Sequence, residues 1–86
     1  MSEFILYLNT LEKYDDKIDA TGLLCPLPVL KIRKKLNTMD VGEVLFILAD
    51  DPAAIVDVPH FCNEQGYTLI ESKKNDNLLS FSIRKT

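Results

Sequence analysis

The chain has 86 residues, of which 47% are hydrophobic and 27% are charged, and its formal net charge is -3. This composition is typical of one soluble globular domain and excludes a disordered chain, and the negative charge argues against a general nucleic-acid binder. Two cysteines are too few for the disulfide framework of a small secreted domain, so we expect a cytoplasmic protein. No apolar run reaches transmembrane length, so no membrane contact is expected.

Residues 1–16 are interpreted as an N-terminal extension and residues 17–86 as the domain proper. Apolar residues of the extension fall at helical spacing and predict a short amphipathic helix: Phe4, Tyr7, Leu8 and Leu11. The segment from Phe4 to Leu8 also has the composition of a strand. We expect the extension to pack against the edge of the domain, and the alternative is contact with a second protein.

The segment around Cys25 is the most informative part of the chain. Proline is favoured in the first turn of a helix, so Pro26 and Pro28 predict a helix that begins here, with Cys25 at its N-cap. The amides of Leu27 and Val29 then face the sulfur, because Pro28 has no N–H. These amides and the helix dipole stabilise a thiolate, so we expect the pKa of Cys25 to lie below that of a free thiol.

This helix is expected to run from Pro26 to about Thr38, between strands at 18–20 and 44–49. The second strand is a continuous apolar run and is predicted to be central in the sheet and covered on more than one side. A strand, a helix and a strand in this order form a right-handed unit with parallel strands. The helix has a predicted buried stripe: Val29, Ile32, Leu36 and Met39. Its other faces carry basic residues: Lys31, Arg33, Lys34 and Lys35.

A second helix is predicted after Asp51, which can cap it with Pro52 at its first position. Its apolar face consists of Ala54, Val58, Phe61 and Cys62, and Gly66 ends it. Pro59 lies inside this pattern and predicts either a kink or a fresh start capped by Asp57. Strands at 67–72 and 79–84 then form a hairpin around a polar turn. The element order is therefore β-α-β-α-β-β.

Cys25 is the candidate nucleophile. Cys62 lies on an apolar helix face and is expected to be buried and structural. His60 is the only histidine; a solvated side chain is favoured over a catalytic partner of Cys25. No metal site is expected, because His60 and Cys62 point to different sides of a helix. Asp50 and Asp51 are interpreted as cap and turn residues.

The motif from Gly22 to Pro28 resembles the Cys-Pro-x-Pro signature of the TusA/SirA-like sulfur-carrier family. Segments 49–53 and 57–62 resemble that family's later motifs, and the similarity covers about residues 18–85. It implies a two-layer α/β sandwich, with a four-stranded mixed sheet and both helices on one face. Leu24 and Leu27 depart from the branch that serves transfer-RNA thiolation, where these positions are often basic and acidic.

The resemblance also implies a function. Cys25 corresponds to the cysteine that accepts sulfane sulfur as a persulfide from a cysteine desulfurase or similar donor. It then passes the sulfur to an acceptor protein, in the best-known members toward 2-thiouridine in transfer RNA. Pro26, Leu27, Pro28 and Val29 would support the sulfur site, and no cofactor is expected.

Two other functions stay open, a thiol redox protein and a non-catalytic interaction module. The absence of a nearby resolving cysteine argues against redox chemistry. The basic residues of the first helix are either a solvated face or a surface that steers an acidic partner toward Cys25.

Overall fold

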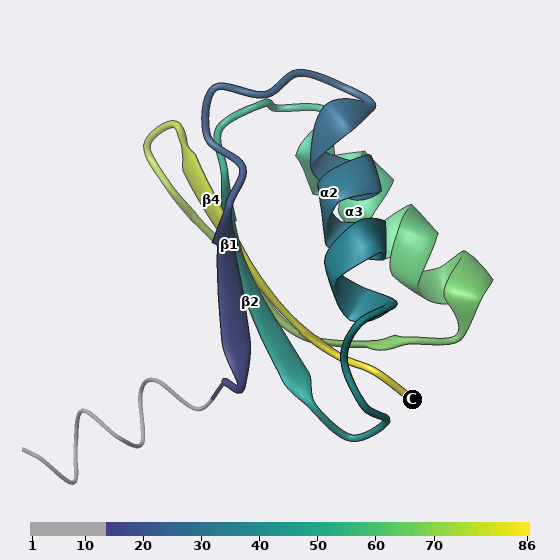
Figure 1. Cartoon of the computed structure of the whole chain (residues 1–86). Coiled ribbons are helices and arrows are strands. Elements are labelled where there is room, and N and C mark those ends of the chain that lie inside the picture. The colour runs from purple at the N-terminus through teal and green to yellow at the C-terminus, as the bar shows by residue number, and fades with distance from the viewer. Residues whose placement is uncertain (1–13) are drawn as a thin grey trace, which may run out of the picture.

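The structure is a computed structural model and describes residues 14–86, so the helix predicted within the N-terminal extension lies outside the described residues. The elements follow the predicted order. They are β1 (Asp16–Asp19), α2 (Leu27–Leu36), β2 (Val44–Ala49), α3 (Ala54–Gln65), β3 (Thr68–Asn75) and β4 (Leu78–Arg84). Figure 1 shows α2 and α3 together on one face of the sheet, which confirms the two-layer arrangement.

The sheet has four strands in the order β1-β2-β4-β3. Strand β1 pairs with β2 in parallel, whereas β4 pairs with both β2 and β3 in antiparallel fashion. The mixed sheet, the central position of β2 and the C-terminal hairpin are all confirmed. The two inner strands supply the most apolar segments, because an inner strand has no open edge and one of its faces lies under the helices.

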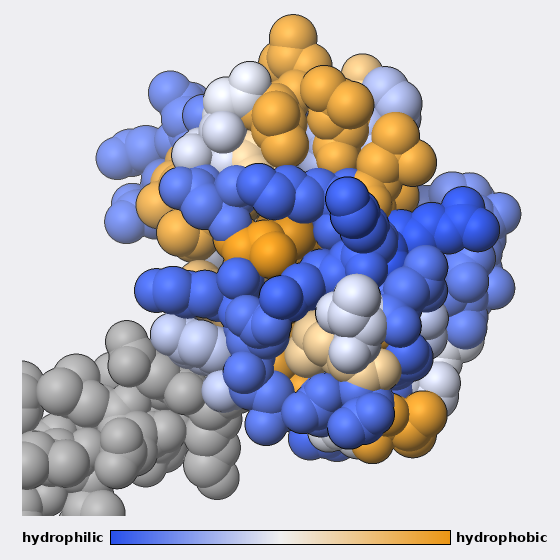
Figure 2. Space-filling model, viewed as in Figure 1, coloured by the Kyte–Doolittle hydropathy of each residue, from blue (hydrophilic) through white to orange (hydrophobic). Residues whose placement is uncertain are grey.

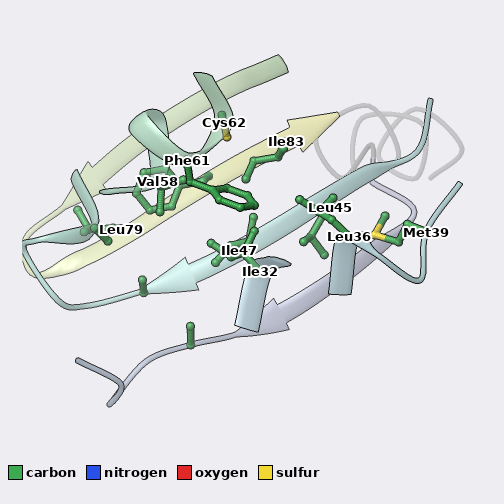
Figure 3. Close-up of a cluster of buried hydrophobic side chains, with 14 residues drawn as sticks. Ile32, Leu36, Met39, Leu45, Ile47, Val58, Phe61, Cys62, Leu79 and Ile83 are labelled. Carbon is green, nitrogen blue, oxygen red and sulfur yellow. The ribbon is translucent and has the colours of Figure 1, made fainter. Parts of the chain in front are cut away.

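The core lies between the sheet and the two helices (Figure 3). From the sheet, Leu45 and Ile47 of β2 pair with Ile83 and Phe81 of β4, and all four side chains are buried. The helices add further buried side chains: Ile32, Leu36, Val58, Phe61 and Cys62. Cys62 is only 2% exposed, which confirms that it is a core residue. The helix stripe is also confirmed, except that Val29 is only half-buried and Pro28 is buried beside it.

The opposite face of the sheet is more open. Phe46 and Leu48 alternate with the core residues of β2 and are half-buried. The ring of Tyr14 stacks on Phe46 with a centroid separation of 5.5 Å. This contact gives β2 partial cover on its second side, as its continuous apolar sequence predicts. Within residues 14–86, neither helix is long and apolar enough to cross a membrane.

Helix α3 departs from the expectation at both Pro59 and its start. It is one continuous helix from Ala54 to Gln65 with Pro59 inside, so the predicted fresh start at Asp57 is wrong. Proline deprives only the carbonyl of Ile55 of its N–H partner, and Ile55 is 44% exposed, so water can serve that carbonyl. Pro52 precedes the helix in a turn and is not its first residue. The predicted end at Gly66 is confirmed, with a left-handed φ of 77°.

The remaining differences concern element ends. Strand β1 begins at Asp16 and ends at Asp19, earlier than the predicted 18–20, because its hydrogen bonds follow the parallel register with β2. The C-terminal hairpin turns at Asp76, whose φ is 56°, and its strands extend through most of the predicted polar turn. Backbone pairing with β4 therefore outweighs the polar character of Lys73 and Lys74.

Candidate active site around Cys25

Cys25 lies in the loop between β1 and α2, and its side chain is exposed. Two carboxylates from the connection between β2 and α3 shape this loop. The Gly22 N–H donates to Asp50 Oδ1 at 2.9 Å, and the Cys25 N–H donates to Asp51 Oδ2 at 2.6 Å. Gly22 has a φ of 83°, a left-handed conformation that glycine adopts without strain. The position of Cys25 is therefore determined by residues far away in the sequence.

Asp51 uses both of its oxygens. While Oδ2 accepts from Cys25, Oδ1 accepts from the Ala53 N–H at 3.1 Å. The turn before α3 then continues as the Ala54 N–H donates to the Asp51 carbonyl at 2.9 Å. The prediction that Asp51 caps α3 is wrong, because the N-cap is Ala53 and no side chain caps the helix. The Asp51 carboxylate instead ties the turn before α3 to the backbone of the nucleophile.

The prediction that Cys25 is the N-cap of the first helix is wrong by one residue. Helix α2 begins at Leu27 and its N-cap is Pro26, with no side-chain cap. The Leu27 N–H donates to the Leu24 carbonyl at 2.8 Å, so this amide is engaged in the turn that carries Cys25. It therefore cannot serve the sulfur, as the N-cap geometry requires.

The predicted direction of the Cys25 pKa shift is also wrong. A hydrogen bond between the thiol and the Asp57 carboxylate raises the pKa of Cys25 above its usual value. Desolvation and the negative charges of Asp57 and Asp51 act in the same direction. Each of these contributions disfavours the thiolate, since a carboxylate accepts the thiol proton and repels the ionised sulfur. The carboxylates around Cys25 in the free domain therefore favour its thiol form.

A groove of about 330 Å³ extends from Cys25 between the two helices. Helix α2 and the residue before it contribute Pro26, Val29, Leu30 and Arg33, and helix α3 contributes Asp57, His60, Phe61, Glu64 and Gln65. His60 Nε2 lies 3.5 Å from Glu64 Oε2, and both side chains are largely exposed. His60 is therefore a solvated residue on the wall of the groove, as favoured from the sequence.

The basic residues of α2 are divided between two surfaces. Lys31 Nζ donates to the Asp19 carbonyl at 2.9 Å, and Lys35 Nζ lies 2.6 Å from Asp16 Oδ2, so both hold α2 to β1. Together with Lys34 they line a hollow on that side of the helix. Arg33 instead lines the groove that contains Cys25. The four cations therefore do not form one surface around the thiol.

The comparison with protein families is consistent with this geometry. A model described as "Sulfurtransferase TusA" matches residues 16–85, which is most of the chain. The chain belongs to the TusA family. A curated relative named "Sulfur carrier protein TusA", from Allochromatium vinosum, is 41% identical over 73 residues, covering 85% of this chain and 96% of the relative.

A solved structure supports the fold. The crystal structure of a SirA-like protein from Desulfitobacterium hafniense is similar to this TusA-family chain with a TM-score of 0.71 and 26% sequence identity. The similarity covers 81% of this chain and 96% of the solved chain. The resemblance inferred from the Cys-Pro-x-Pro motif is therefore confirmed over the domain as a whole.

The sequence did not reveal what Asp51 and Asp57 do in this TusA-family site. Its local patterns give both residues roles on α3 alone, although the structure brings them to the nucleophile. The sequence signal is present in a weak form. If both helices cover one face of the sheet, acidic residues just before the second helix and in its first turn lie near the start of the first helix. No group of three or more potential metal ligands comes together within residues 14–86.

Proposed function

We propose that this protein is a sulfur carrier that accepts sulfane sulfur on Cys25 from a cysteine desulfurase or similar donor and relays it to an acceptor protein. The observation that carries the proposal is the exposed Cys25, held by Asp51 at the entrance of a groove in a TusA-family domain. The name of the Allochromatium vinosum relative, a sulfur carrier protein, supports the same role.

The chemistry of loading is thiolate attack on a persulfide. The Cys25 thiolate attacks the terminal sulfur of a donor persulfide, a new S–S bond forms on Cys25, and the donor sulfur leaves as a thiolate. Discharge repeats the step with the acceptor as nucleophile and Cys25 as leaving group. Each step forms one S–S bond and breaks another. The carrier therefore supplies a positioned nucleophile for loading and a leaving group for discharge, and the proposed chemistry uses no cofactor.

The residues around Cys25 divide this work. Pro26 and Pro28 begin α2 directly after the nucleophile, and Val29 lines the groove beside it. Asp57 keeps the free carrier in its thiol form, which protects the exposed sulfur from alkylation and oxidation because the thiolate is the reactive species. A partner that docks over Asp57 and displaces the thiol from its carboxylate would remove this restraint, and Arg33 lies on the same groove.

The wider context of the carrier also belongs to the proposal. Residues 17–86 form the carrier domain and residues 1–16 an extension of it. We place the protein in the cytoplasm, where reducing conditions keep Cys25 available. We propose that the sulfur passes to an acceptor protein, with 2-thiouridine in transfer RNA as one candidate destination, and that the carrier itself does not bind nucleic acid.

Transfer of sulfur from a purified cysteine desulfurase tests the proposal. In the presence of cysteine, the intact mass of the carrier should increase by one sulfur atom, and a reductant should reverse the increase. Cys25→Ser should abolish the addition, whereas Cys62→Ala should retain it, because Cys62 is buried in the core. A carrier that gains no sulfur from the desulfurase or from a small-molecule persulfide, yet forms disulfides at Cys25, would instead be a redox protein.

A further inference from the structure

Three leucines with exposed side chains lie next to Cys25. Leu24 is 68% exposed, Leu27 49% and Leu30 50%. The hydrogen bond from the Leu27 N–H to the Leu24 carbonyl closes a turn, so these two leucines flank the nucleophile on either side. Leu30 follows Leu27 on the same face of α2, one turn later. We call these three residues the leucine patch.

The leucine patch is continuous with the groove. Leu30 lines the groove together with Cys25, and Val29 and the buried Phe61 lie beside it. In Figure 2, apolar side chains gather at the end of the molecule where α2 begins. A single exposed leucine is common on a protein surface, but adjoining apolar residues around one reactive group are typical of an interaction site.

We propose that the leucine patch is the docking surface for the protein that donates sulfur to Cys25, and that this donor presents its sulfur-bearing cysteine within an apolar surface. The inference rests on the proposed function and names the surface chemistry of the donor. A donor has to bring its terminal sulfur into bonding contact with Cys25 Sγ. Because Leu24 and Leu27 flank this atom, the donor covers both.

Sulfur transfer brings the donor to this corner of the molecule, because the transferred sulfur lies between Cys25 Sγ and the donor's cysteine sulfur during loading. The charges along the groove do not select a partner of one sign, because Arg33 opposes Asp57 and Glu64. The apolar surface is the feature that distinguishes this corner of the molecule.

Activated peptides can stand in for the donor surface in a test of this recognition. Three pentapeptides carry a central cysteine as a mixed disulfide with 2-thiopyridine, flanked by leucine, glutamine or lysine. The Cys25 thiolate attacks the peptide sulfur, a Cys25–peptide disulfide forms, and the thiopyridine sulfur leaves, so one S–S bond replaces another. The absorbance of the released thiopyridone gives the rate, and Cys25→Ser gives the background.

We expect the wild-type domain to react about fivefold faster with the leucine peptide than with the glutamine peptide, since docking buries apolar surface on both sides. The double variant Leu24→Gln/Leu27→Gln should lose this preference, so that its rates with the leucine and glutamine peptides become equal. Val41→Gln is the matched control, because Val41 is 75% exposed in the turn after α2, and it should retain the preference.

Several results would overturn the inference. Equal rates with the leucine and glutamine peptides would do so, as would a preference that survives in the double variant. A lysine peptide that reacts fastest would assign recognition to Asp51 and Asp57 instead. These outcomes leave the proposed function intact if the desulfurase still loads Cys25. A wild-type domain that gains no sulfur from any persulfide contradicts the proposed function, and this inference fails with it.

Discussion

Replacing Asp51 with alanine is expected to lower the stability of the domain and at the same time to make Cys25 more reactive. The carboxylate accepts hydrogen bonds from the Cys25 N–H at 2.6 Å and from the Ala53 N–H at 3.1 Å. Each bond is charge-assisted, but water reaches this surface and replaces part of the loss. We therefore expect a decrease of about 1–2 kcal/mol in the free energy of unfolding.

The reactivity of the thiol should change in the opposite direction. The negative charge of Asp51 helps to raise the pKa of Cys25, so its removal lowers that pKa and increases the thiolate fraction near neutral pH. Alkylation of Cys25 at pH 7.5, a pH at which roughly a tenth or less of an ordinary thiol is ionised, should therefore be faster in Asp51→Ala than in the wild type.

Thermal unfolding and the alkylation rate measure the two effects. For a domain of this size, the expected destabilisation corresponds to a fall of about 5–15 °C in Tm. Asp40→Ala is the matched control, because it removes one exposed carboxylate from the turn after α2, at the opposite end of that helix from Cys25. If Asp51→Ala and Asp40→Ala have the same Tm, the Asp51 carboxylate does not hold the Cys25 loop, and the assignment of Asp51 as the anchor of this loop is wrong.

Two further predictions concern the thiols. Asp57→Asn should shift the pH profile of Cys25 alkylation to lower pH, because it removes the carboxylate that accepts the thiol proton. Glu64→Gln on the same groove should leave the profile unchanged. Identical profiles for wild type and Asp57→Asn would exclude Asp57 as the cause of the raised pKa of Cys25. Burial raises the pKa of Cys62 from 9.0 to about 11, so the folded state keeps a proton that the unfolded state releases, and stability should fall as the pH rises through this range. Denaturant unfolding should show that the free energy of unfolding of Cys62→Ala declines less than that of the wild type over the same pH interval. Equal declines would mean that Cys62 titrates alike in the folded and unfolded states.

Local patterns in the sequence predicted most of the fold. Proline directly after Cys25 places the start of a helix, and the actual start at Leu27 differs from the prediction by one residue. The apolar run from Val44 to Ala49 identified a central strand, and its bounds are those predicted. These predictions succeed because each depends on residues that are neighbours along the chain. Pro59 misled the prediction, because a single lost hydrogen bond at an exposed carbonyl is tolerated inside a packed helix.

The electrostatics of the site could not be predicted in this way. The expectation of a more acidic Cys25 considered only the amides and the dipole of its own helix. The contacts that reverse the shift come from Asp51 and Asp57, 26 and 32 residues further along the chain. Their distance from the sulfur depends on how α3 packs beside α2 on the sheet. A periodic pattern shows which face of a helix is buried, but it does not show which polar residue lies next to the neighbouring loop.

The position of β4 has a consequence for the newly made protein. This strand follows every other described element in the sequence, yet it lies between β2 and β3 in the sheet. While the ribosome still holds it, β1 and β2 form only a two-stranded sheet and β3 has no partner, so the helices have no stable surface to cover. The contacts of Asp50 and Asp51 with the Cys25 loop then have no fixed geometry. A nascent or prematurely terminated chain therefore carries the thiol on an unstructured segment, and a competent carrier exists only after translation has passed β4.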